Sequence, residues 1–207
     1  MICQRWKNNY RFATVYDTVR RIPVYSAYTF SGKEQKTRSN EWKIEPQAVN
    51  SDYSGTGFTR GHVFPYQFAA DQDQADSTFT LTNVAPQTKD SNQKWAKEVE
   101  APIRKGIKQG CKLEQNHRVH FVTGVVPGNN WIPIKRDGKE FQEGINIPSH
   151  FWSAYCCTNN KGQLVARANI AELENFKVKH SNIQDLNTEL TNLYNSPFSV
   201  FPGLDLK

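Results

Sequence analysis

The 207-residue sequence lacks several patterns that would place it in a special class of protein. No apolar run approaches the length of about 18 residues that a transmembrane helix needs, so no membrane-spanning segment is expected. No C-x-x-C pair occurs, which argues against a zinc ribbon. Internal repeats, low-complexity tracts and N-x-S/T sequons are also missing. With 37% hydrophobic residues, the chain suits one globular domain over residues 1–207.

Cysteine is scarce, and the four cysteines are Cys3, Cys111, Cys156 and Cys157. In a reducing compartment these would be free thiols, whereas an even count in an exported protein suggests two disulfides. Cys156 and Cys157 are adjacent, so on a strand they point to opposite faces and can hardly bond to each other. We therefore expect Cys3 and Cys111 each to pair with one of them, with no free thiol remaining. This pattern favours a secreted, extracellular protein.

The chain is basic, with a formal net charge of +6 from 26 Lys and Arg against 20 Asp and Glu. A solvated surface explains this balance without any partner. A positive field also concentrates polyanions, so DNA and RNA are candidate partners. Charge alone does not separate nucleic acid from heparin or an acidic membrane.

The hydrophobic pattern indicates strand pairs around one long helix. Runs rich in Val, Ile, Tyr, Phe and Thr predict strands at 11–17, 21–30, 77–86, 117–126, 150–157 and 163–170, and residues 31–47 are typical of a polar loop. A helix is predicted over 90–110, which Pro102 should kink or divide. Apolar residues at helical spacing predict a last helix near Ile183 to Leu193. The fold class is therefore α+β, with an antiparallel central sheet flanked by helices.

Three side chains have the chemistry that phosphodiester cleavage needs. His62 can accept a proton from water, because imidazole titrates near neutral pH. Asn92 can bind a hard cation through its amide oxygen and leave the charge of the cation largely intact. Arg38 can donate two hydrogen bonds to one phosphate. His62 and Asn92 also have plain structural explanations, since a lone histidine commonly bonds within a loop or core and Asn92 could cap a helix.

Helical geometry separates two candidate carboxylates. On an ideal α-helix, Glu100 lies about 80° around the axis from Asn92, whereas Glu98 lies about 120° the other way. Glu100 therefore shares the side of Asn92 better, about two turns further along, which suits a contact with a cation through water. Both glutamates could also belong to a solvated face.

Several motifs occur in an order that resembles a known family. They are "TRSNEWKIEP" (37–46), "TRGH" (59–62), "LTNVAPQ" (81–87), "SNQKWAKEVE" (91–100), "VTGVV" (122–126) and "IPSHFW" (147–152). In this order they resemble the ββα-metal (His-Me finger), sugar-nonspecific nucleases, a family that includes secreted bacterial nucleases and mitochondrial endonuclease G. The N-terminal segments and the Tyr-Cys-Cys after "HFWSA" most resemble its vertebrate endonuclease domain-containing 1 group, whose members are secreted or membrane-associated.

The resemblance implies a role for each matched residue. His62 would be the general base, and Asn92 would be the single protein ligand of a hydrated Mg²⁺, with Mn²⁺ or Ca²⁺ as alternatives. Glu100 would be held to that ion through water, and Arg38 would contact the scissile phosphate. The remaining matched residues would line the site or contact phosphate: Arg60, Asn83, Gln87 and Arg104.

The chain departs from the family pattern at two places. Thr59 stands where the motif has Asp, which removes a carboxylate beside the base. The helix is one residue short between Asn92 and Trp95, so the position four residues after Trp95 holds Val99. Counting from Asn92 restores Glu100, and Glu98 is the fallback. The expected activity is metal-dependent, non-specific endonucleolytic cleavage of DNA and, as a second candidate substrate, RNA. The alternative is a catalytically silent module that binds nucleic acid or heparin.

Overall fold

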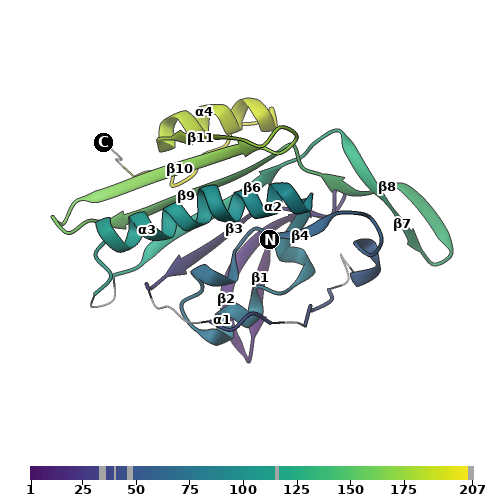
Figure 1. Ribbon diagram of the computed structural model, residues 1–207, viewed down its shortest axis with the longest axis horizontal. Coiled ribbons are helices and arrows are strands. Elements are labelled where there is room, and N and C mark those ends of the chain that lie inside the picture. Colours follow the sequence, from purple (N-terminus) through teal and green to yellow (C-terminus); the bar gives the residue numbers. More distant parts are fainter. Residues whose placement is uncertain (33–35, 40, 46–48, 115–116, 205–207) are drawn as a thin grey trace.

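The computed structural model describes residues 1–207 except 33–35, 40, 46–48, 115–116 and 205–207. Its central feature is a seven-stranded sheet with the order β1-β2-β3-β6-β9-β10-β11, in which every neighbouring pair is antiparallel (Figure 1). The strands are β1 (Ile2–Trp6), β2 (Asn9–Asp17), β3 (Ile22–Phe30), β6 (Val119–Val126), β9 (His150–Thr158), β10 (Leu164–Glu172) and β11 (Lys177–Ser181).

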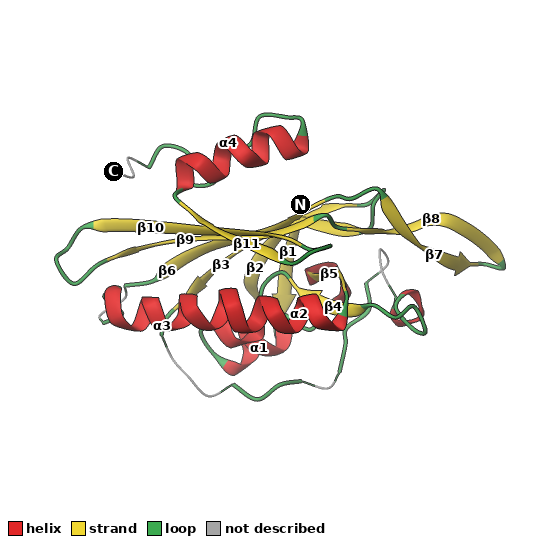
Figure 2. Cartoon of the chain, turned by 45° about the horizontal axis from the view of Figure 1, so that its top comes forward, coloured by secondary structure: helices red, strands yellow, loops and turns green. Residues whose placement is uncertain are grey.

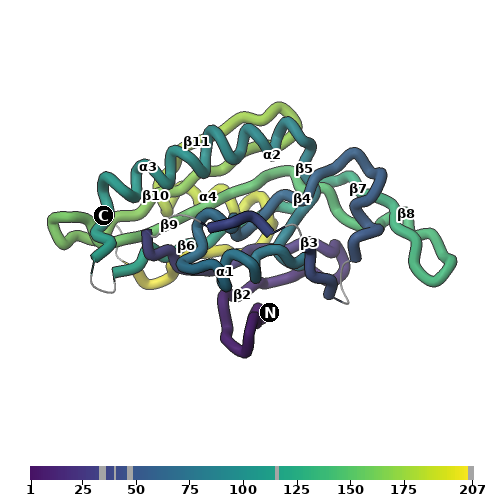
Figure 3. Tube along the Cα trace, turned by 60° about the horizontal axis from the view of Figure 1, so that its bottom comes forward, coloured from purple at the N-terminus to yellow at the C-terminus, as the bar shows by residue number. Residues whose placement is uncertain are grey.

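Among the residues that the structure describes, two short ribbons and four α-helices surround this sheet. The ribbons pair β4 (Thr59–His62) with β5 (Val84–Gln87) and β7 (Asn130–Arg136) with β8 (Lys139–Ile147). The helices are α1 (Gln72–Ser77), α2 (Lys89–Trp95), α3 (Ala101–Gly110) and α4 (Ile183–Tyr194). Figure 2 shows α1, α2 and α3 on one face of the sheet and α4 on the other. In Figure 3 the β7–β8 hairpin projects at the end opposite the β9–β10 turn. Within the described residues, no helix is long and apolar enough to cross a bilayer.

Each face of the sheet buries its own apolar cluster, and the alternation of side chains along β9 serves both. Phe151 packs in the cluster under α1–α3, and the next residue, Trp152, packs in the cluster under α4. Both rings are fully buried. On α4, Leu186 and Leu190 close the second cluster, and truncating either leucine to alanine should cost about 2–5 kcal/mol of folding free energy.

The predicted fold class is confirmed, and so are most of the predicted strands. The strand expected over 77–86 is wrong for most of its length. Thr78 caps α1, and a 3-10 turn occupies Leu81–Asn83, so only Val84–Gln87 is a strand. The cause is local: the hydroxyls of Ser77 and Thr78 donate to the carbonyls of Gln74 and Ala75 and so hold a helical turn. Strands β1, β4, β7, β8 and β11 were not predicted.

The long helix is divided, as Pro102 suggested, but by a wide turn rather than a break. Residues Ala96–Glu100 form a π-helical turn in which the amide of Ala101 donates to the carbonyl of Ala96. The turn lies directly before the proline, which has no N–H to continue an α-helical ladder. Because a π turn holds more residues than an α turn, it removes part of the offset of about 80° expected between Asn92 and Glu100.

The disulfide expectation is half right. Cys111, at the end of α3, is bonded to Cys157 on β9. Cys3 and Cys156 are free thiols, Cys3 exposed and Cys156 buried, so the expectation of no free thiol is wrong. Cys3 lies on β1, and β2, β3 and β6 separate it from β9. At about 4.8 Å per strand, this puts the two thiols far beyond the reach of a disulfide.

We predict that thiol labelling will find one reactive cysteine, Cys3, in the native protein and a second, Cys156, only after unfolding. Mass spectrometry of labelled peptides identifies the sites.

Cys111→Ser should lower the free energy of unfolding by about 2–4 kcal/mol, because the Cys111–Cys157 bond closes a loop of 46 residues. Cys3→Ser is the matched control and should leave stability unchanged. A native protein in which four thiols react would contradict the assignment.

Candidate active site

A cavity of about 810 Å³ lies beside β4 and the first turn of α2. Its lining combines cations, amides and aromatic rings: Arg38, Trp42, Asn50, Ser51, Tyr53, Ser54, Phe58, Thr59, Arg60, Lys89, Asn92 and Gln93. Three of these residues are cationic, and none of the described lining residues carries a carboxylate. A water-filled space with this lining attracts anions.

The β4–β5 ribbon sorts the residues of the "TRGH" motif onto two faces. Successive side chains of a strand alternate, so Arg60 and His62 share one face while Thr59 and Gly61 share the other. Thr59 pairs with Gln87 and His62 with Val84 across the ribbon. A Cβ at residue 61 would displace the side chain of Gln87, which glycine leaves in place.

Two aromatic rings hold the Arg60 guanidinium at the cavity wall. Its central carbon lies 5.1 Å from the ring centre of Trp42 and 5.7 Å from that of Tyr53. One terminal nitrogen donates to the Asn50 side chain at 3.3 Å, and Nε is buried without a partner. These contacts restrict the side chain and leave donors for an anion.

His62 lies beneath a cover of aromatic side chains. Its ring centre is 4.8 Å from Phe79, 5.2 Å from Trp42 and 6.4 Å from Tyr66. The residue is half-buried, and Nε2 is fully covered and has no hydrogen-bond partner. Burial and, secondarily, the positive charge of Arg38 lower the pKa of His62 to about 3. The imidazole is therefore neutral at pH 7, as a proton acceptor must be.

Trp42 was not singled out from the sequence, although it contacts both Arg60 and His62. The segment around it is fixed at Lys43. The Lys43 amide donates to the carbonyl of Phe79 at 2.7 Å, and its carbonyl accepts from the amide of Leu81 at 3.2 Å. The only sequence signal for Trp42 is its place within the arginine-bearing motif at 37–46.

Asn92 does not cap α2, because the Thr88 hydroxyl does so by accepting from the amide of Ser91. Its side chain lines the cavity, and its Nδ2 donates to Thr59 Oγ1 at 3.0 Å. The Thr59 hydroxyl in turn donates to the backbone carbonyl of Gln87 at 2.9 Å. The structure thus brings Arg38, Arg60 and Asn92 to one cavity, with His62 on the same strand face as Arg60.

Glu100 and Arg104 lie further along the helix and do not line this cavity. Burial raises the pKa of Glu100 to about 7, although the Arg104 cation and the Trp95 indole oppose this shift. Arg104 also donates to the Gln67 side chain at 2.9 Å. Glu98, by contrast, is exposed. Of the two candidate carboxylates, the partly buried one is therefore Glu100.

Asn83 and Gln87 lie inside the protein, away from the cavity that holds Asn92. The Asn83 amide is fully buried and makes four hydrogen bonds, including those to the backbone of Phe64 and to Ser26. Asn83 therefore holds neighbouring segments together, and a substrate contact is not proposed for it.

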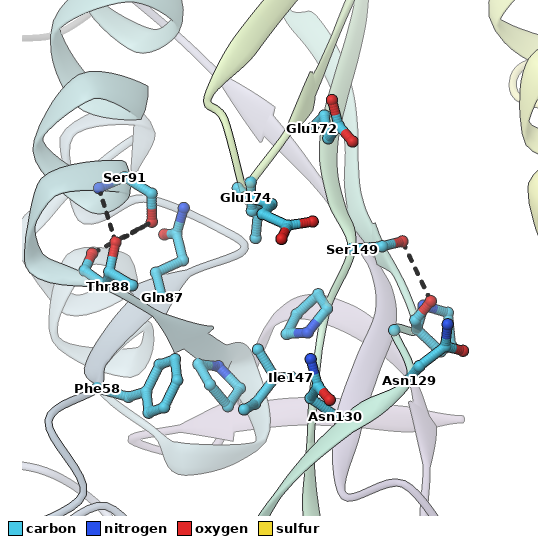
Figure 4. A pocket seen from close by; sticks show the side chains of 15 residues that line it. Phe58, Gln87, Thr88, Ser91, Asn129, Asn130, Ile147, Ser149, Glu172 and Glu174 are labelled. Carbon is cyan, nitrogen blue, oxygen red and sulfur yellow. Dashed lines mark hydrogen bonds between the residues drawn. The ribbon is translucent and has the colours of Figure 1, made fainter.

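Gln87 borders a second cavity, of about 390 Å³, on the other side of the first turn of α2. Both polar atoms of its side chain are buried without a partner. In Figure 4, Gln87, Thr88 and Ser91 form one wall of this cavity, opposite Glu172 and Ser149. Gln87 thus belongs to a different space from Asn92, and no substrate contact is proposed for it either.

A comparison with protein families shows to which family the chain belongs. The profile of the DNA/RNA non-specific endonucleases matches residues 2–199. The chain belongs to this family. Its curated relatives include the human endonuclease domain-containing 1 protein, which is 28% identical over 184 residues, covering 75% of this chain and 34% of the relative. Bovine mitochondrial endonuclease G is 30% identical over 132 residues, covering 59% of this chain and 40% of the relative.

The fold of the family is seen in a solved structure as well. The EndoG/EndoGI complex matches with a TM-score of 0.67 at 19% identity, covering 93% of this chain and 84% of that chain. The ββα-metal nuclease fold expected from the motifs is therefore confirmed. The β4–β5 ribbon followed by α2 corresponds to the ββα unit. The chain spans about a third of the length of the endonuclease domain-containing 1 relatives.

For this member of the family, we predict that Trp42→Ala will raise the pKa of His62 towards 6.5, because the aromatic cover that desolvates the ring is removed. NMR titration of the imidazole measures the shift, and Trp131→Ala, on β7, is the control. The lowered pKa of His62 makes its protonation unfavourable for the folded state as the pH falls from about 6.5 towards 3. The variant should accordingly lose less stability in acid. An unchanged pKa would show that Trp42 is not the cover.

Proposed function

We propose that the protein is a metal-dependent, non-specific endonuclease that hydrolyses DNA and, as a second candidate substrate, RNA. The observation that carries this proposal is the cavity in which Arg38, Arg60 and Lys89 meet the side chain of Asn92. Cations without a lining carboxylate suit a phosphodiester, and they address the backbone rather than base edges. Residues 1–207 would act as one endonuclease domain.

The side chains around Asn92 suit a cation that keeps most of its water better than a cation enclosed by several protein ligands. Among the described residues, no group of three or more His, Cys, Asp or Glu could enclose a metal ion. Asn92 offers one amide oxygen, because its nitrogen is engaged with Thr59. Mg²⁺ keeps most of its water and accepts few protein ligands, so this donor set suits it, and Mn²⁺ or Ca²⁺ are alternatives. When bound, such an ion neutralises charge on the phosphate oxygens.

The remaining chemistry would come from the chain itself. His62, neutral at pH 7, would accept the proton of the attacking water at a ring nitrogen. Arg38 and Arg60 would bind phosphate oxygens, and Arg60 is held for that contact by Trp42 and Tyr53. Glu100, whose raised pKa allows it to ionise near neutrality, would bind water on the side of the helix that carries Asn92. Water would reach His62 Nε2 only after movement of the covering side chains, because that atom is buried.

The covered Nε2 also favours a second candidate function, a catalytically silent module that binds nucleic acid or heparin. A plasmid-nicking assay with and without EDTA separates the two. Nicking that EDTA abolishes supports the endonuclease, whereas binding without nicking at any divalent metal supports the silent module. Competition by heparin without hydrolysis of any nucleic acid would assign the basic surface to heparin.

We propose that the protein works in an oxidising, extracellular compartment. The Cys111–Cys157 disulfide supports this, because such bonds persist outside the reducing cytosol. Some relatives carry mitochondrial names, so location varies across the family. Redox Western analysis of the protein in conditioned medium and in cell lysate tests the proposal.

We predict that His62→Ala will lower the rate of plasmid nicking by at least about 100-fold while DNA affinity stays unchanged, as expected for loss of a general base. The exposed His120 on β6 provides the control variant, His120→Ala, which should nick at the wild-type rate. DNA affinity is measured in EDTA by fluorescence anisotropy. Near wild-type nicking by His62→Ala would refute the proposed base.

We also predict that the logarithm of DNA affinity will fall with the logarithm of salt concentration, with a slope equivalent to about three to six phosphate contacts at roughly 0.9 per contact on duplex DNA.

Arg38→Ala should reduce turnover more than DNA affinity, because the phosphate that Arg38 binds gains negative charge in the transition state. Lys161→Ala, in the distant β9–β10 turn, should reduce neither turnover nor DNA affinity. Strong preference for one short DNA sequence, or affinity insensitive to salt, would contradict the proposal.

A further inference from the structure

We propose that Thr59 positions Asn92, because its hydroxyl fixes the Asn92 amide with Nδ2 turned inward and Oδ1 turned to the cavity. The importance of this orientation rests on the proposed function, in which Oδ1 is the atom that would meet a cation. The orientation itself follows from two hydrogen bonds and does not depend on activity.

The first hydrogen bond, from Thr59 to Gln87, determines whether the Thr59 hydroxyl donates to Asn92 or accepts from it. A hydroxyl has one proton, and Thr59 donates it to the backbone carbonyl of Gln87 at 2.9 Å. A carbonyl oxygen cannot donate, so the proton cannot pass the other way. Towards its second neighbour, Thr59 Oγ1 therefore presents only lone pairs.

The second hydrogen bond then fixes Asn92. The atom of Asn92 that lies 3.0 Å from Thr59 Oγ1 must be a donor, and Nδ2 is the only donor of that side chain. An amide rotated by half a turn would place Oδ1 against Oγ1, two acceptors in contact. This settles an orientation that atom positions alone leave ambiguous for an asparagine.

The consequence appears on the cavity side. Asn92 is half-buried and lines the 810 Å³ cavity, and among the described residues no donor bonds to its Oδ1. The oxygen thus keeps its lone pairs for a ligand in the cavity. The same reasoning explains why threonine can stand where the family motif has aspartate, since both side chains accept a hydrogen bond from Nδ2.

The test compares Thr59→Val, which removes the hydroxyl at nearly constant shape, with Thr59→Ser, which keeps it. Mn²⁺ binding to the DNA-free protein is measured by electron paramagnetic resonance. We expect at least about tenfold weaker binding in Thr59→Val, the usual effect of losing a group that orients a metal ligand, and binding within about twofold of wild type in Thr59→Ser. Wild-type affinity in Thr59→Val, or equal loss in both variants, would overturn the proposal.

A second measurement needs no metal and no variant. In the ¹⁵N spectrum of the wild-type protein, one side-chain amide proton of Asn92 should exchange with solvent more slowly than the side-chain amide protons of exposed Gln93. Equal, fast exchange would overturn the proposal even if Thr59→Val failed to fold. If the wild type does not nick plasmid but Thr59→Val binds Mn²⁺ more weakly than the wild type, the proposed function fails and the positioning role stands. If the wild type nicks and Thr59→Val binds Mn²⁺ normally, only the positioning role fails.

Discussion

The antiparallel pairing of β4 with β5 is the constraint on which the site depends. It sets Thr59 opposite Gln87 and His62 opposite Val84, and alternation then puts Arg60 and His62 on the face of the aromatic cover and Thr59 on the face towards Asn92. Moving the register by one residue would exchange these two faces. Gly61 leaves room for the Gln87 side chain, and the Thr59–Asn92 hydrogen bond ties α2 to β4.

Around this ribbon the protein separates two kinds of charge. Cations gather in the larger cavity, whereas Glu172 and Glu174 line the smaller one across the first turn of α2. Phe58 borders both spaces and divides them. A polyanion would thus be attracted to one side of the turn and repelled from the other.

The sequence predicted the central strands and helices better than the side-chain contacts of the candidate site. Runs rich in Val, Tyr, Phe and Thr located most of the central strands, because a sheet that buries an apolar cluster on each face needs strands that are apolar along much of their length. The order of the motifs predicted one shared site for His62, Arg38, Arg60 and Asn92. The last three line one cavity, and His62 lies on the same strand face as Arg60. Trp42 was missed because its role arises from the packing of a loop, whose contacts with Phe79 and Leu81 through Lys43 are tertiary. Asn83 and Gln87 were placed at the site because an amide in a motif looks the same whether it binds a substrate or the backbone. Burial decides between these roles, and burial is a tertiary property.

The disulfide has a mechanical consequence for the other end of the helical rod. The rod that starts with α2 ends at Cys111, where a covalent bond ties it to β9, while Asn92 near its start is tied to β4 through one side-chain hydrogen bond to Thr59. Between these two ties the rod rests on the core through Trp95, Val99, Ile103 and Ile107, so it is a lever supported along its length. At about 1.5 Å per residue Asn92 is roughly 28 Å from Cys111, so a tilt of about one degree would move Asn92 by roughly 0.5 Å. That displacement equals the tolerance of about 0.5 Å within which a catalytic group must be held. The accuracy of the site thus depends on how stiffly the buried packing and the distant disulfide together hold the helix.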